Sequence, residues 1–368
     1  MATRAIDISI DHVRVSAYTI PTDYPEADGT FAWDSTTLVL VEASGGGRIG
    51  LGYTYADLAT ATLINETLAA IVIGKDALDV PAAWNEMVNA IRNSGRPGVA
   101  SMAISAIDNA LWDLKAHLLD LPLCKLLGMV RQSVPVYGSG GFTTYPLQRL
   151  HDQLAGWVAQ GIPRVKMKIG THPDEDVGRV KAAREAIGDS ADLYVDANGA
   201  YTRKQALQSA EAFASLGVVW FEEPVSSNDL EGLRLLRDRA PAGMDVAAGE
   251  YGYDLWYFKR MLAAGAVDVQ QADCTRCGGI TGFLRAGALC EAFQLPISAH
   301  CAPAQHLHAC CAVPARLSPC EYFHDHVRIE RMLFEGVVTP VEGELRPDLS
   351  RPGIGLSLKR AEAEKYAV

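Results

Sequence analysis

Lysines, carboxylates and a histidine carry the main chemical signal in this sequence. Lys166 and Lys168 alternate with apolar residues in Val165-Lys166-Met167-Lys168-Ile169, which predicts a buried strand with both ammonium groups on one face. Burying two like charges is costly unless one lysine loses its proton more easily or anionic groups lie nearby. A lysine that deprotonates easily is a general base. An edge strand with two solvated lysines explains this pentapeptide equally well, so its meaning depends on the rest of the chain.

Three carboxylates end neighbouring predicted strands. Asp196 lies in Val195-Asp196-Ala197-Asn198-Gly199, Glu222 in Trp220-Phe221-Glu222-Glu223-Pro224, and Glu250 in Ala248-Gly249-Glu250. Three oxygen ligands with no sulfur or imidazole among them are typical of a Mg²⁺ site. We expect Glu223 to point to the opposite side of its strand from Glu222, which makes it the weaker ligand candidate.

A histidine and a further carboxylate follow two later strands. His300 ends one predicted strand and Asp273 follows the strand before it. A carboxylate partner fixes the tautomer of an imidazole and raises its basicity, so this pair predicts a general acid or base. A single buried histidine is otherwise explained by packing, and it is the position opposite Lys168 that gives His300 a chemical role.

These residues need a scaffold that brings strand ends together. The alternation of short apolar segments with helical patterns predicts eight strands: 134–137, 164–169, 192–196, 218–222, 245–248, 267–270, 297–299 and 319–322. Polar residues at or just past the strand ends recur at intervals of roughly 20 to 28 residues, the length of one barrel unit. They are Lys168, Asp196, Glu222, Glu250, Asp273, His300 and Glu321. In an α/β barrel such side chains converge at the carboxyl ends of the strands.

The N-terminal part has a different pattern. A strand is predicted over 13–20, a hairpin over 37–41 and 49–53, and helices from Pro81 and over 99–119. A loop rich in Asp, Pro and Gly, Pro21 to Trp33, lies between the first two strands, and a loop of that length is functional or disordered. We place a domain boundary near residues 129–133.

With these residues and motifs, the sequence resembles the mandelate racemase subgroup of the enolase superfamily. From Lys166 to Glu321 the resemblance rests on the K-x-K pair, D-x-N, E-E-P, G-E, the run from Asp273 to Gly282 and the S-x-H that ends at His300. Ser105-Ala106-Ile107-Asp108 with Leu111-Trp112-Asp113 is similar to the α+β capping domain of that family. The resemblance covers nearly the whole chain.

The resemblance implies a modified TIM barrel of (β/α)7β type over residues 131–334, with an N-terminal α+β capping domain over 1–130. The C-terminal tail, 335–368, is expected to pack back on the cap. The resemblance also implies one Mg²⁺ per subunit and an assembly of identical subunits.

The same resemblance assigns roles to individual residues. Asp196, Glu222 and Glu250 match the metal ligands. Lys168 matches the base on one face of the substrate, and His300, paired with Asp273, the base on the other. The matched substrate contacts are Lys166, which neutralises the substrate carboxylate, Asn198 beside the metal, and Glu321, which hydrogen-bonds the carboxylate or its enediolate. From the capping loop we add Tyr24 and Trp33.

Composition limits the partners. The chain has 368 residues, 49% of them hydrophobic, and a net charge of −11 with both signs interspersed, which argues against nucleic acid or an anionic membrane as partner. No apolar run of membrane-spanning length occurs, and Met1 to Asp7 lacks the apolar core of a signal peptide, so a cytoplasmic location is expected. The eight cysteines do not form a secreted disulfide pattern, and the single Cys274-x-x-Cys277 pair argues against structural zinc.

We therefore expect a Mg²⁺-dependent dehydratase that removes the α-proton of a 2,3-dihydroxy carboxylate, such as an acid sugar, and leaves a 2-keto-3-deoxy acid. A racemase or epimerase that uses Lys168 and His300 on one carbon passes through the same enediolate, so the sequence leaves both open. A non-catalytic sugar-acid binding protein is the alternative from another class. The acidic residues of Pro21 to Trp33 favour a polyhydroxy acid.

Overall fold

The structure is a computed structural model that describes residues 8–368. The expectation about a signal peptide concerns residues 1–7, which lie outside this range. Within the described part of the chain, none of the helices has both the length and the apolar character needed to cross a bilayer.

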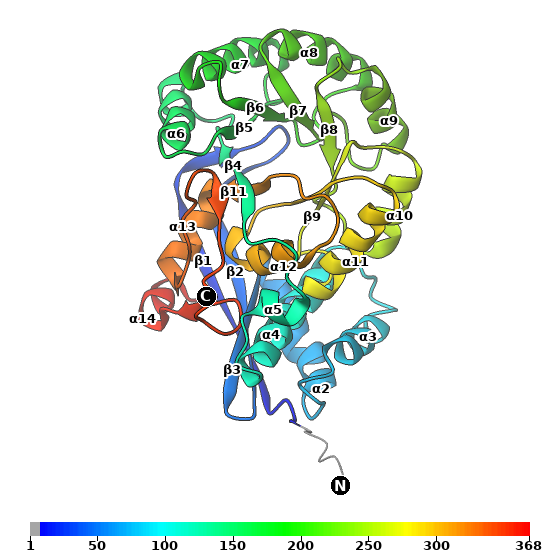
Figure 1. Ribbon diagram of the computed structural model, residues 1–368, viewed down its shortest axis with the longest axis vertical. Coiled ribbons are helices and arrows are strands. Elements are labelled where there is room, and N and C mark those ends of the chain that lie inside the picture. Colours follow the sequence, from blue (N-terminus) through cyan, green and yellow to red (C-terminus); the bar gives the residue numbers. More distant parts are fainter. Residues whose placement is uncertain (1–7) are drawn as a thin grey trace.

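Eight parallel strands form a barrel in the second part of the chain (Figure 1). They are β4 (Val134–Gly140), β5 (Arg164–Lys168), β6 (Asp192–Asp196), β7 (Val218–Glu222), β8 (Asp245–Ala248), β9 (Val269–Ala272), β10 (Ile297–Ala299) and β11 (Cys320–Phe323). Their order is β10-β9-β8-β7-β6-β5-β4-β11, and the two ends meet where Ile297 pairs with Leu317. The predicted strands are confirmed, with β9 beginning two residues later than expected.

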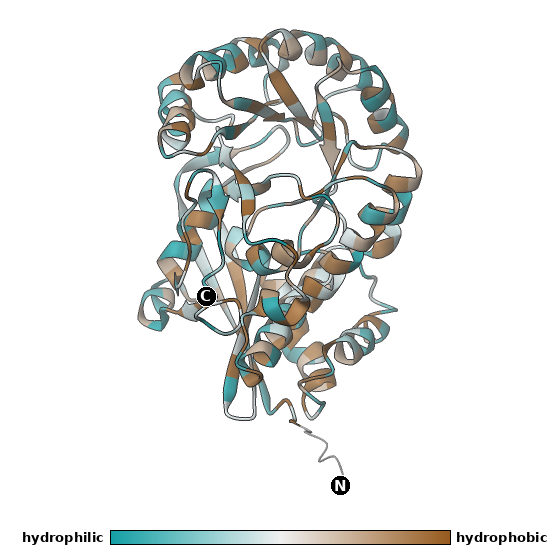
Figure 2. Ribbon diagram, viewed as in Figure 1, coloured by the Kyte–Doolittle hydropathy of each residue, from teal (hydrophilic) through white to brown (hydrophobic). Residues whose placement is uncertain are grey.

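Seven helices connect these strands and lie on the outside of the barrel (Figure 1). They are α6 (Leu147–Ala159), α7 (Pro173–Ile187), α8 (Arg203–Ser215), α9 (Leu230–Arg239), α10 (Leu255–Ala263), α11 (Gly279–Ala292) and α12 (Pro303–Ala312). Helices such as α6 and α9 carry both hydrophobic and hydrophilic residues, as expected when one side packs on the strands (Figure 2), whereas every residue of α12 is buried. This is the (β/α)7β arrangement, followed by α13 (His324–Leu333).

The N-terminal capping domain consists of a three-stranded antiparallel sheet and a group of helices. Its elements are β1 (His12–Ala27), β2 (Ala32–Gly45), β3 (Arg48–Tyr55), α1 (Leu58–Leu63), a π-helical turn (Ile64–Leu68), α2 (Ala69–Val72), α3 (Val80–Ala90), α4 (Val99–Leu118) and α5 (Leu123–Leu127). Helix α4 packs closely on β3, because Gly50 and Gly52 leave no side chain between the strand and the helix backbone.

The predicted loop from Pro21 to Trp33 is largely strand, which corrects the sequence analysis. The first two strands pair up to Pro21, shift register through a bulge, and pair again at Glu26 with Trp33. Only residues 28–31 form the turn between them. The hairpin tip contacts the barrel: Thr171 Oγ1 donates to the carbonyl of Asp28 at 2.7 Å. The cap thus reaches the barrel mouth as an ordered β-hairpin.

Buried polar residues of α4 hold the loop that follows β9. Ser105 Oγ accepts hydrogen bonds from the backbone N–H groups of Gly278 and Gly279, at 2.9 and 3.0 Å. Asp108 accepts from the N–H of Thr281 at 2.9 Å, and Gly279, at φ +76°, leaves no room for a β-carbon beside it. The run from Asp273 to Gly282 is therefore fixed by docking onto the cap.

The C-terminal segment returns to the cap. After α13 come β12 (Phe334–Glu335), β13 (Glu344–Leu345), β14 (Ser357–Leu358), α14 (Arg360–Ala363) and a 3₁₀ turn (Glu364–Tyr366). The N–H of Ile354 donates to Asp113 of α4 at 2.6 Å, and the N–H of Val368 donates to the carbonyl of Ala17 at 3.2 Å. All eight cysteines lie in the described part of the chain and are buried and free of disulfides.

Candidate active site

The barrel places the polar strand-end residues together at one mouth. Lys166 and Lys168 lie on β5, Asp196 and Glu222 end β6 and β7, and Glu321 lies on β11. The other three follow β8, β9 and β10 directly or within two residues: Glu250, Asp273 and His300. All eight side chains are buried, with at most 5% of each residue exposed. Because they come from different strands, this convergence follows from the barrel geometry.

An aromatic layer fills the barrel beneath this cluster. Tyr194 and Trp220 stack at 5.0 Å between ring centroids, each two residues before a carboxylate on the same face of its strand. Trp220 Nε1 donates to Glu222 Oε2 at 2.9 Å, and Lys166 Nζ lies 5.3 Å from the centre of the Tyr137 ring. The layer closes the barrel interior below the charged groups.

The carboxylates of Asp196, Glu222 and Glu250 form a candidate cation site. One oxygen of each lies within 4.8 Å of the others. Burial and the charge of Asp196 raise the pKa of Glu222 well above its usual range, and Glu250 Oε2 is buried with no hydrogen-bond partner. An unpartnered buried oxygen within a set of three hard donors fits a divalent cation such as Mg²⁺.

Both lysines are paired with these carboxylates. Lys166 Nζ is 2.9 Å from Glu321 Oε1 and 3.3 Å from Asp196 Oδ2, and it also contacts Glu222. Lys168 Nζ donates to Asp196 Oδ2 at 2.5 Å. Burial alone lowers the pKa of each lysine, but the surrounding carboxylates raise both above the ordinary value. The same pairing holds the pKa of Asp196 at about 2 despite its burial.

His300 and Asp273 form the expected pair. His300 Nδ1 lies 2.9 Å from Asp273 Oδ2, and the other oxygen of Asp273 accepts the N–H of Thr275 at 2.7 Å. Burial raises the pKa of Asp273, but its hydrogen bond with His300 and the nearby cations lower that pKa by a larger amount. The net pKa lies below the usual range, so this carboxylate stays ionised. With Nδ1–H donated to Asp273, the Nε2 atom of His300 is left as a proton acceptor.

A cavity of ≈520 Å³ connects these groups. It is lined from the barrel by Lys168, Asn198, Glu250, Arg276 and His300. The lining residues that come from the cap include Asp28, Trp33, Thr36 and Tyr55. Lys168 and His300 therefore face one space from β5 and from the end of β10, two strands that are not neighbours in the sheet. Lys166, Asp196 and Glu321 lie below its surface.

The two predicted contacts from the hairpin differ in position. Trp33 lines the cavity, and its Nε1 donates to Glu26 Oε2 at 2.9 Å. Tyr24 faces elsewhere: its ring meets Tyr145 edge-on at 5.4 Å and lines a separate hollow with Arg149. Tyr24 is therefore outside the lining of this cavity, and its contact with the substrate stays a prediction.

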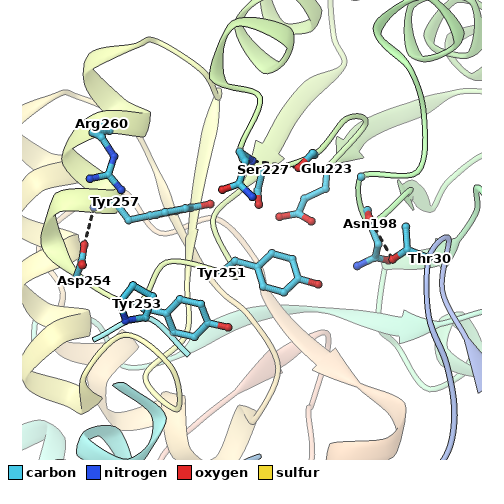
Figure 3. Close-up of a pocket in the computed structure, with 13 residues that line it drawn as sticks. Thr30, Asn198, Glu223, Ser227, Tyr251, Tyr253, Asp254, Tyr257 and Arg260 are labelled. Carbon is cyan, nitrogen blue, oxygen red and sulfur yellow. Dashed lines mark hydrogen bonds between the residues drawn. The ribbon is translucent and has the colours of Figure 1, made fainter. Parts of the chain in front are cut away.

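Glu223 departs from the sequence analysis. We expected it on the opposite side of its strand, but its φ of +37° breaks the alternation that an extended strand imposes. Its residue is 1% exposed, its Oε1 has no hydrogen-bond partner, and burial together with the charges of Glu250 and Asp196 raises its pKa well above the usual range. Glu223 therefore lies beside the carboxylate cluster, in a second pocket (Figure 3).

Other residues at the site carried weaker signals in the sequence. Arg276 forms ion pairs with two carboxylates: its Nη1 lies 3.2 Å from Glu250 Oε1 and its Nε lies 3.7 Å from Asp273 Oδ2. His326 lines the cavity, and its Nδ1 accepts the N–H of Ala302 at 3.2 Å. Both residues follow a strand end closely, after β9 and β11, but they lie in a turn and a helix, where strand alternation does not predict the direction of a side chain.

Comparison with known proteins identifies the family. The mandelate racemase / muconate lactonizing enzyme N-terminal domain model matches residues 13–128, and the enolase C-terminal domain-like model matches residues 149–363. The chain therefore belongs to the mandelate racemase / muconate lactonizing enzyme family of the enolase superfamily.

Individual relatives extend this comparison. A mandelate racemase/muconate lactonizing enzyme-like protein from Rubrobacter xylanophilus is 61% identical, with a TM-score of 0.96 over 98% of this chain and 100% of that one. The L-talarate/galactarate dehydratase of Salmonella typhimurium, liganded with Mg and L-lyxarohydroxamate, is 29% identical, with a TM-score of 0.90 over 100% and 96%. The 3,6-anhydro-alpha-L-galactonate cycloisomerase of Streptomyces coelicolor is 36% identical over 83% of this chain and 86% of its own length.

Proposed function

We propose that this protein is a Mg²⁺-dependent acid-sugar dehydratase, which converts a 2,3-dihydroxy carboxylate to a 2-keto-3-deoxy acid. The observation that carries the proposal is the presence of two acid/base groups, Lys168 and the His300–Asp273 pair, in one cavity beside a three-carboxylate cluster. Relatives named as dehydratases of talarate, galactarate and arabinonate support the reaction class.

Mg²⁺ would be held by Asp196, Glu222 and Glu250. The fit rests on their mutual proximity and on the unpartnered oxygen of Glu250. When bound, Mg²⁺ supplies positive charge that stabilises the anion formed from the substrate and offsets the effect of Asp196 on the pKa of Lys168. The exclusively oxygen donor set favours Mg²⁺ over zinc.

The other residues bind the substrate and move its protons. Lys166 remains protonated and attracts the substrate carboxylate, with Glu321 held in place by Ser139 Oγ, which donates to it at 2.5 Å. Lys168 Nζ or His300 Nε2 accepts the α-proton, according to the face from which that proton points. When His300 Nε2 has accepted the α-proton, it returns that proton to the departing 3-hydroxyl; when Lys168 has accepted it, His300 starts protonated at Nε2 and donates its own proton. In both cases one water leaves, and the resulting enol tautomerises to the 2-keto-3-deoxy acid.

Two other reactions begin with the same proton transfer. In racemisation or epimerisation, the second base returns a proton to the opposite face of the α-carbon. In cycloisomerisation, suggested by the name of the Streptomyces coelicolor relative, a ring bond to oxygen takes the place of the leaving hydroxide. Inversion at the α-carbon needs both bases, whereas an elimination can begin with either one, and the substrate of each reaction is a small carboxylate.

Incubation with Mg²⁺ and a library of acid sugars tests the proposal. We expect 2-keto acid to form from at least one 2,3-dihydroxy acid and formation to stop with EDTA. An epimer or a lactone-derived product without 2-keto-3-deoxy acid would reject dehydration. A non-catalytic binding protein would give no solvent deuterium at any substrate α-carbon. Full activity in both Lys168→Ala and His300→Asn would reject the site assignment.

A further inference from the structure

A second pocket of ≈540 Å³ adjoins the reaction cavity. It lies between the loops that follow β7 and β8, the first turns of α10, and the cap residues Thr30 and Pro97 (Figure 3). Thr30, Asn198 and Tyr251 line both spaces. Because these residues are shared, the two spaces lie side by side.

Hydrogen-bonding groups face this pocket. The carboxyl of Glu223 and the hydroxyls of Tyr251 and Tyr253 point into it (Figure 3). Glu223 Oε1 and Asn198 Oδ1 are buried and have no hydrogen-bond partner within the described protein. Buried oxygens without a partner are costly, so a ligand with hydroxyl groups would satisfy them. The tyrosine rings also offer apolar faces for C–H groups, as in carbohydrate sites.

The inner part of the pocket lacks a cationic partner for a second carboxylate. Among its described lining residues, Arg260 is the only cation, and it is exposed on α10. Asp254 lies at the N-terminus of the same helix, where it accepts the N–H of Tyr257 at 2.8 Å. Glu223 on the inner wall is a carboxyl group and has no cationic residue beside it among the described lining residues, so an anionic ligand end lacks a positively charged partner there.

We propose that this pocket is a subsite for the distal, uncharged polyhydroxylated chain of the substrate. The inference rests on the proposed function and deepens it: the substrate is a monocarboxylic acid sugar whose hydroxylated carbons extend from the reacting C2–C3 unit past Asn198 towards Tyr257. A diacid of the same length places a second carboxylate on the inner wall of the pocket, where no described lining residue offers a positive charge, and is a poorer substrate.

The test compares three 2,3-dihydroxy acids of matched configuration: a four-carbon monoacid, a six-carbon monoacid and a six-carbon diacid. For the holoenzyme with Mg²⁺ we expect kcat/KM to be highest for the six-carbon monoacid. Tyr253→Phe and Tyr257→Phe each lower that value about 3- to 10-fold, the effect of one lost hydrogen bond, and leave the four-carbon acid unchanged. Tyr366→Phe, in the C-terminal 3₁₀ turn, is the matched control and changes neither.

Two outcomes overturn the subsite: equal losses for the four- and six-carbon acids in both variants, or a preference for the diacid. If no acid is turned over, the dehydratase proposal fails and the subsite is judged by binding alone. Saturation-transfer NMR with xylitol, a neutral polyol, then gives a signal in the wild type that the Tyr253→Phe/Tyr257→Phe double variant loses. An equal signal in both proteins overturns the subsite.

Discussion

Replacing Asp273 by Asn tests the acid/base pair without changing the shape of the side chain. In the structure Oδ1 of Asp273 accepts the N–H of Thr275 and Oδ2 faces His300 Nδ1 at 2.9 Å. Asn keeps one oxygen for Thr275 and turns its NH₂ group towards His300. The imidazole then accepts at Nδ1 and carries its proton on Nε2, which is the wrong tautomer for a base that faces the cavity.

The expected loss follows from this change of tautomer. General acid–base catalysis contributes about 10²- to 10⁴-fold, or roughly 3 to 5 kcal/mol of transition-state free energy. The Thr275 hydrogen bond survives, and Arg276 keeps its contact with Glu250 at 3.2 Å. We therefore expect kcat for dehydration to fall by about 10²-fold or more in a protein that remains folded.

Exchange of the substrate α-proton in D₂O separates the two bases. Asp273→Asn should lose exchange of protons that point towards His300, whereas exchange through Lys168 should persist. Asp113→Asn is the matched control, because Asp113 is also a buried carboxylate but contacts Leu51 and Ile354, and none of these three residues lines the cavity. Unchanged exchange on both faces in Asp273→Asn would refute the role of the pair.

Three further measurements test stability and metal binding. Asp113→Asn should lower the unfolding free energy by about 1 to 3 kcal/mol in urea, because an amide nitrogen cannot accept the N–H of Leu51 or Ile354, and activity should be unchanged; equal stability would contradict this. Burial lowers the pKa of His308 from 6.5 to about 4, so on acidification the unfolded chain binds this proton before the folded chain does. The unfolding free energy should therefore decrease as the pH is lowered from 6.5 to 4, by up to about 1.4 kcal/mol per pH unit. His308→Asn should flatten this dependence, and an unaltered slope would assign it to other groups. Mg²⁺ at 100 times its Kd should raise the unfolding free energy by about 2.7 kcal/mol, measured by thermal melting with EDTA as reference, and Asp196→Asn should abolish the increase; no Mg²⁺ effect on the wild type would contradict the metal assignment.

The barrel was predictable because its signals are local and repeated. Each unit supplies a short apolar strand and an amphipathic helix, and a polar residue stands near each strand end, as at Asp196 and Glu222. Since all strands are parallel, the sequence alone indicated that such residues converge. The His300–Asp273 contact followed from the adjacency of β9 and β10 in the sheet.

Features that depend on distant contacts were not predictable. Glu223 faces the second pocket because its backbone is left-handed, which strand periodicity does not reveal. The hairpin from Pro21 to Trp33 contains Pro, Gly and several acidic residues, which locally favour a loop, but pairing across the bulge overrides that preference. The hydrogen-bond partners of Ser105, Gly278 and Gly279, lie 173 and 174 residues away along the chain and emerged only from the fold.

The barrel and the cap supply different kinds of side chain to the reaction cavity. All eight buried ionisable groups of the cluster come from the barrel, whereas Trp33, Thr36 and Tyr55, which form the facing wall, come from the cap. Substitutions in the cap hairpin can therefore change which molecules enter without altering the charges that move protons. Such a division lets one proton-transfer apparatus be retained while substrate preference diverges, so new specificities are best sought by varying the hairpin and leaving the barrel strands intact.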